Sequence, residues 1–158
     1  MNTVKLASII FFFLGLLILF SIIYVLLFPT STTTSIESKP TLEITLYAGE
    51  FDTNFGFGLN KTLSSPGPTI KVKLGDTTKI KLINIGKIPH SFAIVEEERY
   101  DAKPLFGAFI GSPTKPLLPD QEGEIVFKPN REGTFKYICS VPGHLERGML
   151  GIFIVLKD

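Results

Sequence analysis

The feature that most constrains this chain is an apolar run without charge, from Leu6 to Phe28. As a helix, these 23 residues rise about 1.5 Å each, which is enough to span the ~30 Å hydrocarbon core of a bilayer. The run lacks the polar face that a helix packed on a soluble core would show. It predicts a transmembrane anchor within residues 1–28. A cleaved signal peptide is the alternative, although its apolar region is usually shorter and ends at a small-residue cleavage site.

The run separates the N-terminus from a linker and a domain. Residues 29–40, with the sequence PTSTTTSIESKP, are rich in Ser, Thr and Pro and predict a flexible linker. Residues 41–158 are long enough to form one domain with its own core. With either an anchor or a cleaved signal, we expect this domain on the extracytoplasmic side of the membrane.

The domain is predicted to be all-β. Apolar residues alternate with lysines in Thr69–Leu74, and Lys79–Leu82 alternates in the same way. Further strands are expected at Leu42–Ala48, His90–Val95, Glu124–Phe127, Thr134–Cys139 and Met149–Leu156. Gly and Pro separate these segments, and no sustained helical period follows the anchor. About seven or eight short strands predict a sandwich, with residues 99–120 forming a long loop that contains a short helical turn.

Few residues in the chain can carry chemistry. There are one Cys, two His and two Met, and one Met is the initiator. Cys139, His144 and Met149 lie within eleven residues of one another. Phe135, Tyr137 and Cys139 share one face of a strand by the period of two, so the thiol should point inward. A loop of this kind can gather its Cys, His and Met around one point.

This set of donors favours copper. A thiolate, imidazoles and a thioether suit copper when one Cys and two His lie roughly in a plane with a weak axial Met. His90 is the one other histidine of the chain, and it begins an apolar strand after a turn. Singly, each residue has a structural explanation, such as a buried Cys that behaves as a small hydrophobe. A zinc site more often has further Cys or His ligands, and a Cys139–His144 nucleophilic pair leaves the other two residues unused.

The pattern resembles the cupredoxins, the family of type 1 blue copper proteins. The spacing Cys-x4-His-x4-Met, with a distant upstream His, is most similar to that of the rusticyanins and sulfocyanins. The segment Gly67–Asn84 also looks like a cupredoxin strand pair. The resemblance implies a Greek-key β-sandwich with one copper ion at one pole. It implies that His90, Cys139 and His144 are equatorial ligands and that Met149 is the axial ligand.

The resemblance implies a carrier of single electrons rather than an enzyme, and no small-molecule substrate. Ser91 follows the first ligand where many family members have Asn. A hydroxyl there can donate to the thiolate or brace the ligand loop, and we expect a high reduction potential. With both histidines committed to one metal, this chain holds none for a catalytic second copper. The chain has 16 Lys and Arg and 15 Asp and Glu, and two of the basic residues and one of the acidic residues precede residue 41. The domain therefore has no net charge and no basic surface of the kind that binds nucleic acid.

The expected partners are redox proteins of a respiratory chain, such as cytochromes or a terminal oxidase, met at the membrane surface. Two alternatives stay open. The same domain can be a permanent accessory subunit of a terminal oxidase complex. It can also be a copper storage or delivery protein, which predicts weak, readily exchanged copper and no intense colour.

Overall fold

The computed structural model describes residues 13–20, 23–24 and 40–157, and the chain divides into two units, Met1–Glu37 and Ser38–Asp158. Residues 13–20 and 23–24 of the first unit are α-helical and exposed. None of the helix in the described residues is long and apolar enough to cross a membrane. The predicted linker and most of the predicted anchor lie outside the described residues, so both stay predictions.

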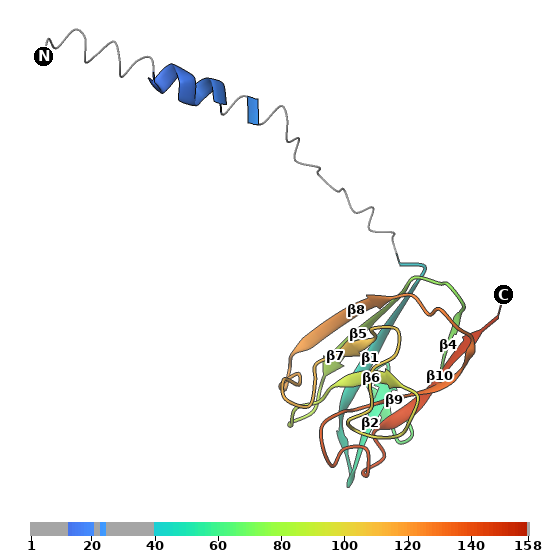
Figure 1. Cartoon of the computed structure of the whole chain (residues 1–158). Helices are drawn as coiled ribbons and strands as arrows, with labels where there is room; N and C mark the ends of the chain where they lie inside the picture. Colours follow the sequence, from blue (N-terminus) through green and yellow to red (C-terminus); the bar gives the residue numbers. More distant parts are fainter. Residues whose placement is uncertain (1–12, 21–22, 25–39, 158) are drawn as a thin grey trace, which may run out of the picture. The chain divides into compact units, whose positions relative to one another are not determined.

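The described part of the second unit is a sandwich of two five-stranded sheets (Figure 1). The first sheet has the order β3-β2-β1-β5-β8 and the second has the order β4-β10-β9-β6-β7. The strands are β1 (Leu42–Phe51), β2 (Asn54–Leu59), β3 (Thr62–Ser64), β4 (Ile70–Lys73), β5 (Thr78–Asn84), β6 (Phe92–Val95), β7 (Phe109–Ile110), β8 (Glu122–Phe127), β9 (Gly133–Ile138) and β10 (Leu150–Leu156). The predicted all-β sandwich is confirmed, with ten strands instead of seven or eight.

The segments with alternating apolar and polar residues form strands that bury their apolar side chains on one face. In β4, Ile70 and Val72 are buried while the lysines beside them are exposed. In β5, Ile80 and Leu82 are completely buried. Each segment covers one face of the core with apolar side chains, which is the main source of stability for a strand of this length.

The strands that the sequence did not predict are β2, β3 and β7. Glycine inside β2 weakens any strand prediction, yet Gly58 is required there, because a Cβ at this position would collide with the backbone of Thr62 in β3. The segment 99–120 is irregular as expected, and β7 pairs with β6 within it. The short helical turn predicted for this segment is wrong, since none of its residues, all of them described, is helical.

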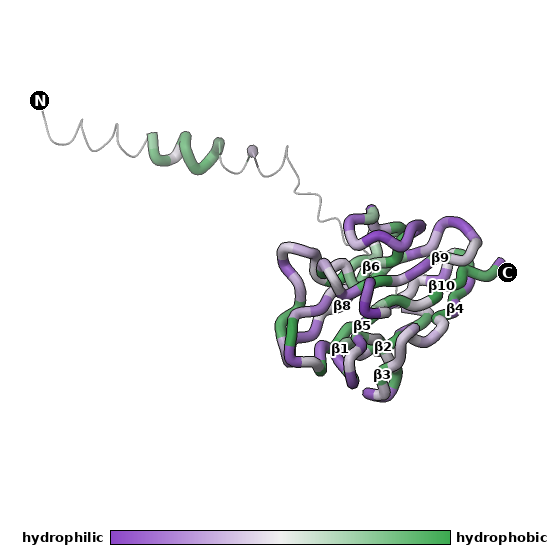
Figure 2. Tube along the Cα trace, turned by 90° about the horizontal axis from the view of Figure 1, so that it is seen from below, coloured by the Kyte–Doolittle hydropathy of each residue, from purple (hydrophilic) through white to green (hydrophobic). Residues whose placement is uncertain are grey.

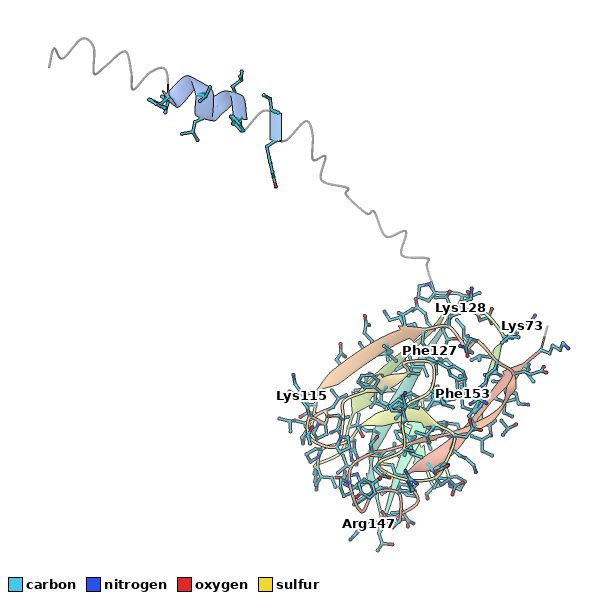
Figure 3. The ribbon with its side chains drawn as sticks, viewed as in Figure 1. Lys73, Lys115, Phe127, Lys128, Arg147 and Phe153 are labelled. Atoms are coloured by element: carbon cyan, nitrogen blue, oxygen red, sulfur yellow. The ribbon has the colours of Figure 1, made fainter. Side chains whose placement is uncertain are left out.

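The core lies between the two sheets. Phe127 of β8 and Phe153 of β10 meet across it with ring centroids 6.0 Å apart (Figure 3). Figure 2 shows hydrophobic and hydrophilic residues interspersed along the strands and loops of the domain. A second aromatic group joins Phe57 of β2 to Phe92 and Tyr137 of the other sheet, with centroids 6.2 and 5.2 Å from the Phe57 ring.

One end of the sandwich collects the segments that the sequence analysis singled out. β6 and β10 begin there, and β1, β5 and β9 end there, as their pairing registers require. Arg147 lies at this end, opposite Lys73 and Lys128 (Figure 3). We call this end the ligand pole, because His90 and Cys139–Met149 all belong to its loops.

Candidate metal centre

Cys139 is held at the ligand pole by the end of β9. Phe135, Tyr137 and Cys139 are all buried in the main core, as the period of two predicted. The backbone N–H of Cys139 donates to the carbonyl of Met149 at 3.1 Å, one step beyond the β9–β10 ladder. The thiol therefore points inward at a position fixed by backbone hydrogen bonds.

The loop after Cys139 turns back on itself and brings in His144. The carbonyl of His144 accepts from the N–H of Arg147 at 3.2 Å and from that of Met149 at 3.1 Å. Gly143 and Gly148 both have φ of +84°, which favours glycine. As a result Nδ1 of His144 lies 3.4 Å from Sγ of Cys139. Met149 is completely buried in the same core cluster as Cys139.

His90 reaches the same place from the loop that joins β5 to β6. It pairs with Leu117 through two backbone hydrogen bonds of 2.9 and 2.8 Å. Asn84 reinforces this pairing, because its side-chain amide donates to the carbonyls of Ile88 and Leu117 at 2.9 and 3.0 Å. The imidazole of His90 is completely buried as a result.

The three side chains form a compact donor set. One ligand atom each from His90, Cys139 and His144 lies within 4.8 Å of the others, and all three residues are buried. Neither ring nitrogen of His90 has a hydrogen-bond partner among the described residues, although buried polar atoms normally have one. A thiol and two imidazoles, one of them with both ring nitrogens unpaired, fit copper. The axial role of Met149 stays a prediction, supported by its backbone contacts with both Cys139 and His144.

Ser91 brings two donors to the sulfur of Cys139. Its backbone N–H donates to Sγ at 3.3 Å, and its Oγ lies 3.6 Å from Sγ. The same Oγ accepts a hydrogen bond of 2.8 Å from the backbone N–H of Ser140. Because this contact occupies Oγ as an acceptor, the hydroxyl proton is available for the sulfur. The hydroxyl is thus placed where the sequence analysis expected it.

The protonation of the metal-free site follows from burial. Burial raises the pKa of the Cys139 thiol, although hydrogen bonds from Val141 and Ser91 oppose the rise. Burial and the neighbouring His144 lower the pKa of His90 to about 4, against the opposite influence of Glu50. Burial also lowers the pKa of His144. Both imidazoles are therefore neutral near pH 7, with lone pairs free for a metal, and binding at the thiol releases a proton.

Two residues of the pole were missed by the sequence analysis, Glu50 and Phe55. They are cross-strand partners in the β1–β2 hairpin, so their side chains lie on one face. The Phe55 ring packs edge-on against His144 with centroids 4.6 Å apart, and Arg147 lies over the ring at 4.9 Å. The two phenylalanines of Asn54–Leu59 were the available signal, but the glycine after each of them weakened the strand prediction.

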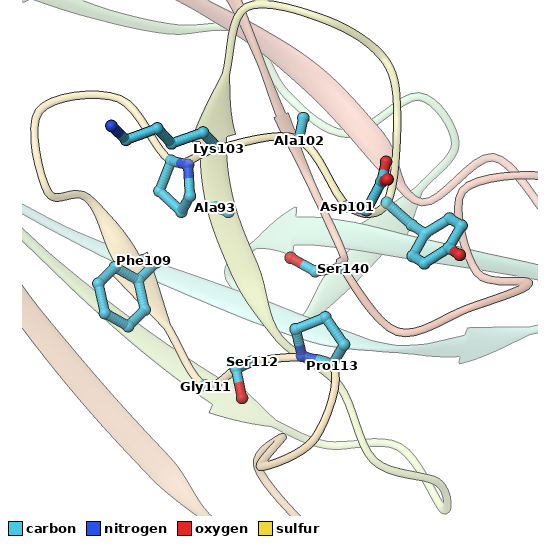
Figure 4. A pocket seen from close by; sticks show the side chains of 11 residues that line it. Ala93, Asp101, Ala102, Lys103, Phe109, Gly111, Ser112, Pro113 and Ser140 are labelled. Atoms are coloured by element: carbon cyan, nitrogen blue, oxygen red, sulfur yellow. The ribbon is translucent and has the colours of Figure 1, made fainter.

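A hollow of about 360 Å³ lies next to the donor set but does not contain it (Figure 4). It is mostly apolar, and Ser140, Phe109 and Pro113 contribute to its wall. None of His90, Cys139 and His144 lines it. The chemistry of the pole therefore belongs to the buried donor set and not to this hollow.

The profile of the multicopper oxidase family matches residues 56–158. The chain belongs to the multicopper oxidase family. The match includes Cys139, His144, Met149 and His90, together with strands β3 to β10 and most of β2.

Its relatives include both enzymes and small copper proteins. Copper-containing nitrite reductase of Alcaligenes xylosoxydans xylosoxydans is 35% identical over 99 residues, which cover 59% of this chain and 28% of the relative. Rusticyanin of Acidithiobacillus ferridurans is 31% identical over 94 residues, covering 56% of this chain and 50% of the relative. The chain therefore matches about a quarter to a half of the length of these relatives.

A solved structure of reduced rusticyanin has the same fold. It superposes with a TM-score of 0.59 over 75% of this chain and 81% of its own, at 22% sequence identity. The cupredoxin-like fold predicted from the sequence is confirmed. The family match and the His-Cys-His cluster together identify copper as the cofactor, as the sequence predicted.

The metal-free protein should show the low pKa of His90 directly. A pH titration of the copper-free protein by NMR can follow the chemical shifts of the imidazole protons of its two histidines. We expect those of His90 to change with a midpoint at about 4, and those of His144 to change below 6.5. In the unfolded chain His90 takes up its proton at a higher pH than in the folded protein. The free energy of unfolding should therefore fall as the pH drops from 6.5 towards 4. A His90 midpoint of 6 or above would contradict the burial described above.

Proposed function

We propose that this protein is a mononuclear type 1 copper protein that carries single electrons. His90, Cys139 and His144 would hold the metal as equatorial ligands, with Met149 as the weak axial ligand. Copper in such a site alternates between Cu(II) and Cu(I), which supplies one-electron chemistry. The observation that supports this most is the convergence of two imidazoles and one thiol at a buried pole.

The surrounding residues suit this role because they hold the donors in place. Backbone hydrogen bonds fix Cys139 and His144, and Asn84 fixes the segment that carries His90. Ligands that cannot move keep the same geometry in both oxidation states, which keeps reorganisation small. His144 is 7% exposed and His90 is 0% exposed, so the His144 edge is the proposed route for electrons to leave.

We infer that the chain itself is not an enzyme. Both histidines of the chain lie in the one cluster. A catalytic second copper bound through histidine would need ligands from elsewhere.

The proposed place of work is the extracytoplasmic surface of a membrane. The support is the uncharged run from Leu6 to Phe28 and the Ser/Thr/Pro-rich segment after it. An anchored carrier would shuttle electrons between respiratory partners such as a cytochrome and a terminal oxidase. Extraction in mild detergent followed by sizing separates this role from that of a permanent oxidase subunit, because the subunit would co-migrate with haem proteins.

The proposed site predicts a visible absorption band. The copper-loaded domain, residues 41–158, should absorb strongly near ~600 nm, as a Cu(II)–thiolate site of this class requires. Cys139→Ser should abolish the band because it removes the thiolate. Ser140→Ala is the matched control, since it keeps the backbone N–H that bonds Ser91, and its band should remain. A colourless oxidised wild-type protein would contradict the proposal and favour a copper storage or delivery role.

The second prediction concerns the reduction potential. A hydrogen bond to the thiolate withdraws electron density from the sulfur, so the Ser91 hydroxyl should favour Cu(I). Ser91→Ala should therefore lower the potential, by roughly 40 mV if the lost hydrogen bond differs by about 1 kcal/mol between oxidation states. Ser112→Ala removes a hydroxyl that bonds only within its own loop, and the potential should not change. A Ser91→Ala protein with an unchanged or higher potential would rule out this role.

A further inference from the structure

Glu50 is fixed beside the candidate metal centre by the loop that precedes His90. Its Oε1 accepts hydrogen bonds from the backbone N–H groups of Lys87 and Ile88 at 3.1 and 2.9 Å. Its Oε2 accepts from the N–H of Lys87 at 2.9 Å. These three hydrogen bonds hold the carboxylate in one orientation.

The loop is shaped around this carboxylate. A Cβ on Gly86 would overlap Oε2 of Glu50 and would also meet Cα of Gly49 at 2.9 Å. Asn84 holds Gly86 in place, because its Oδ1 accepts the N–H of Gly86 at 2.9 Å. Absence of a side chain at this position thus lets the carboxylate approach the loop closely.

The carboxylate faces the ring of His90. Oε1 of Glu50 lies 3.8 Å from Nε2 of His90 in the metal-free structure, which is too long for a hydrogen bond. Nε2 is buried and has no hydrogen-bond partner among the residues described. A neutral imidazole carries its proton on one nitrogen and a lone pair on the other. With Nε2 towards Glu50, Nδ1 is the nitrogen left for the metal.

We propose that Glu50 is the positioning residue of the metal centre, which accepts the Nε2 proton of His90 and so presents Nδ1 to copper. This inference rests on the proposed function, since it requires a metal at His90. Metal-bound histidines commonly donate their other N–H to a carboxylate, which fixes the tautomer and raises the basicity of the ligand. A negative charge one imidazole away from the metal stabilises Cu(II) more than Cu(I). Glu50 therefore opposes the influence of Ser91 on the potential.

The test is Glu50→Gln in the full chain, purified in mild detergent. An amide oxygen in the Oε1 position can still accept from Lys87 and Ile88, but it faces His90 without a negative charge. The amide nitrogen in the Oε2 position can no longer accept from Lys87. We expect the Cu(II) dissociation constant to rise about 10- to 100-fold. Each tenfold loss that is confined to Cu(II) raises the potential by about 59 mV. Glu124→Gln is the matched control, because it removes the same charge from an exposed pair with Lys79, and neither quantity should change by more than about twofold.

A second variant and a second measurement separate positioning from folding. Gly86→Ala should displace the carboxylate while keeping its charge, so it should weaken Cu(II) binding and raise the potential in the same direction. In the Cu(I) form of the wild type, NMR should show a slowly exchanging proton on Nε2 of His90, and this requires no variant to fold. An unchanged Cu(II) affinity and potential in Glu50→Gln, or a His90 that carries no Nε2 proton, would overturn the inference. A wild-type protein without the Cu(II)–thiolate band would instead overturn the proposed function.

Discussion

The antiparallel pairing of β9 with β10 is the constraint on which the ligand pole depends. The ladder ends with the hydrogen bond from Cys139 to Met149, which fixes both ends of the intervening loop at one spacing. The nine residues between Cys139 and Met149 close this loop, and hydrogen bonds to the His144 carbonyl set where the imidazole lies. The position of the sulfur relative to that imidazole is therefore a property of the sheet. A disturbance of the pairing would move every donor in the loop together.

Two neighbours of the donor set act on it in opposite senses. Ser91 directs an N–H and a hydroxyl at the sulfur, and Glu50 directs a carboxylate at the imidazole of His90. The first contact favours the reduced metal and the second favours the oxidised metal. Each depends on backbone geometry, because Ser91 is held by the N–H of Ser140 and Glu50 by those of Lys87 and Ile88. The balance of the site is thus set by loops that are themselves pinned to the two sheets.

Local pattern was sufficient where a segment has a clear period. The alternation in Ile70–Lys73 and Thr78–Asn84 predicted both strands and which side chains they bury. The cluster of Cys139 with His144 followed from spacing within one loop. His90 was placed only because no other histidine exists, since its approach depends on a pairing with Leu117 across the fold. Glu50 could not be predicted, because its role depends on a hairpin whose glycines weaken the strand pattern and on a loop 37 residues further along the chain.

The unequal exposure of the two histidines makes the pole directional. His144 touches solvent along one edge, whereas His90 is enclosed by Leu117, Asn84 and the β1–β2 hairpin. Electron tunnelling slows steeply with distance, so under the proposed function a partner docked at the opposite end of the sandwich would exchange electrons slowly. Productive encounters would then be selected by the short loop around His144. Substitutions on the surface far from this loop would leave the rate of electron exchange unaltered.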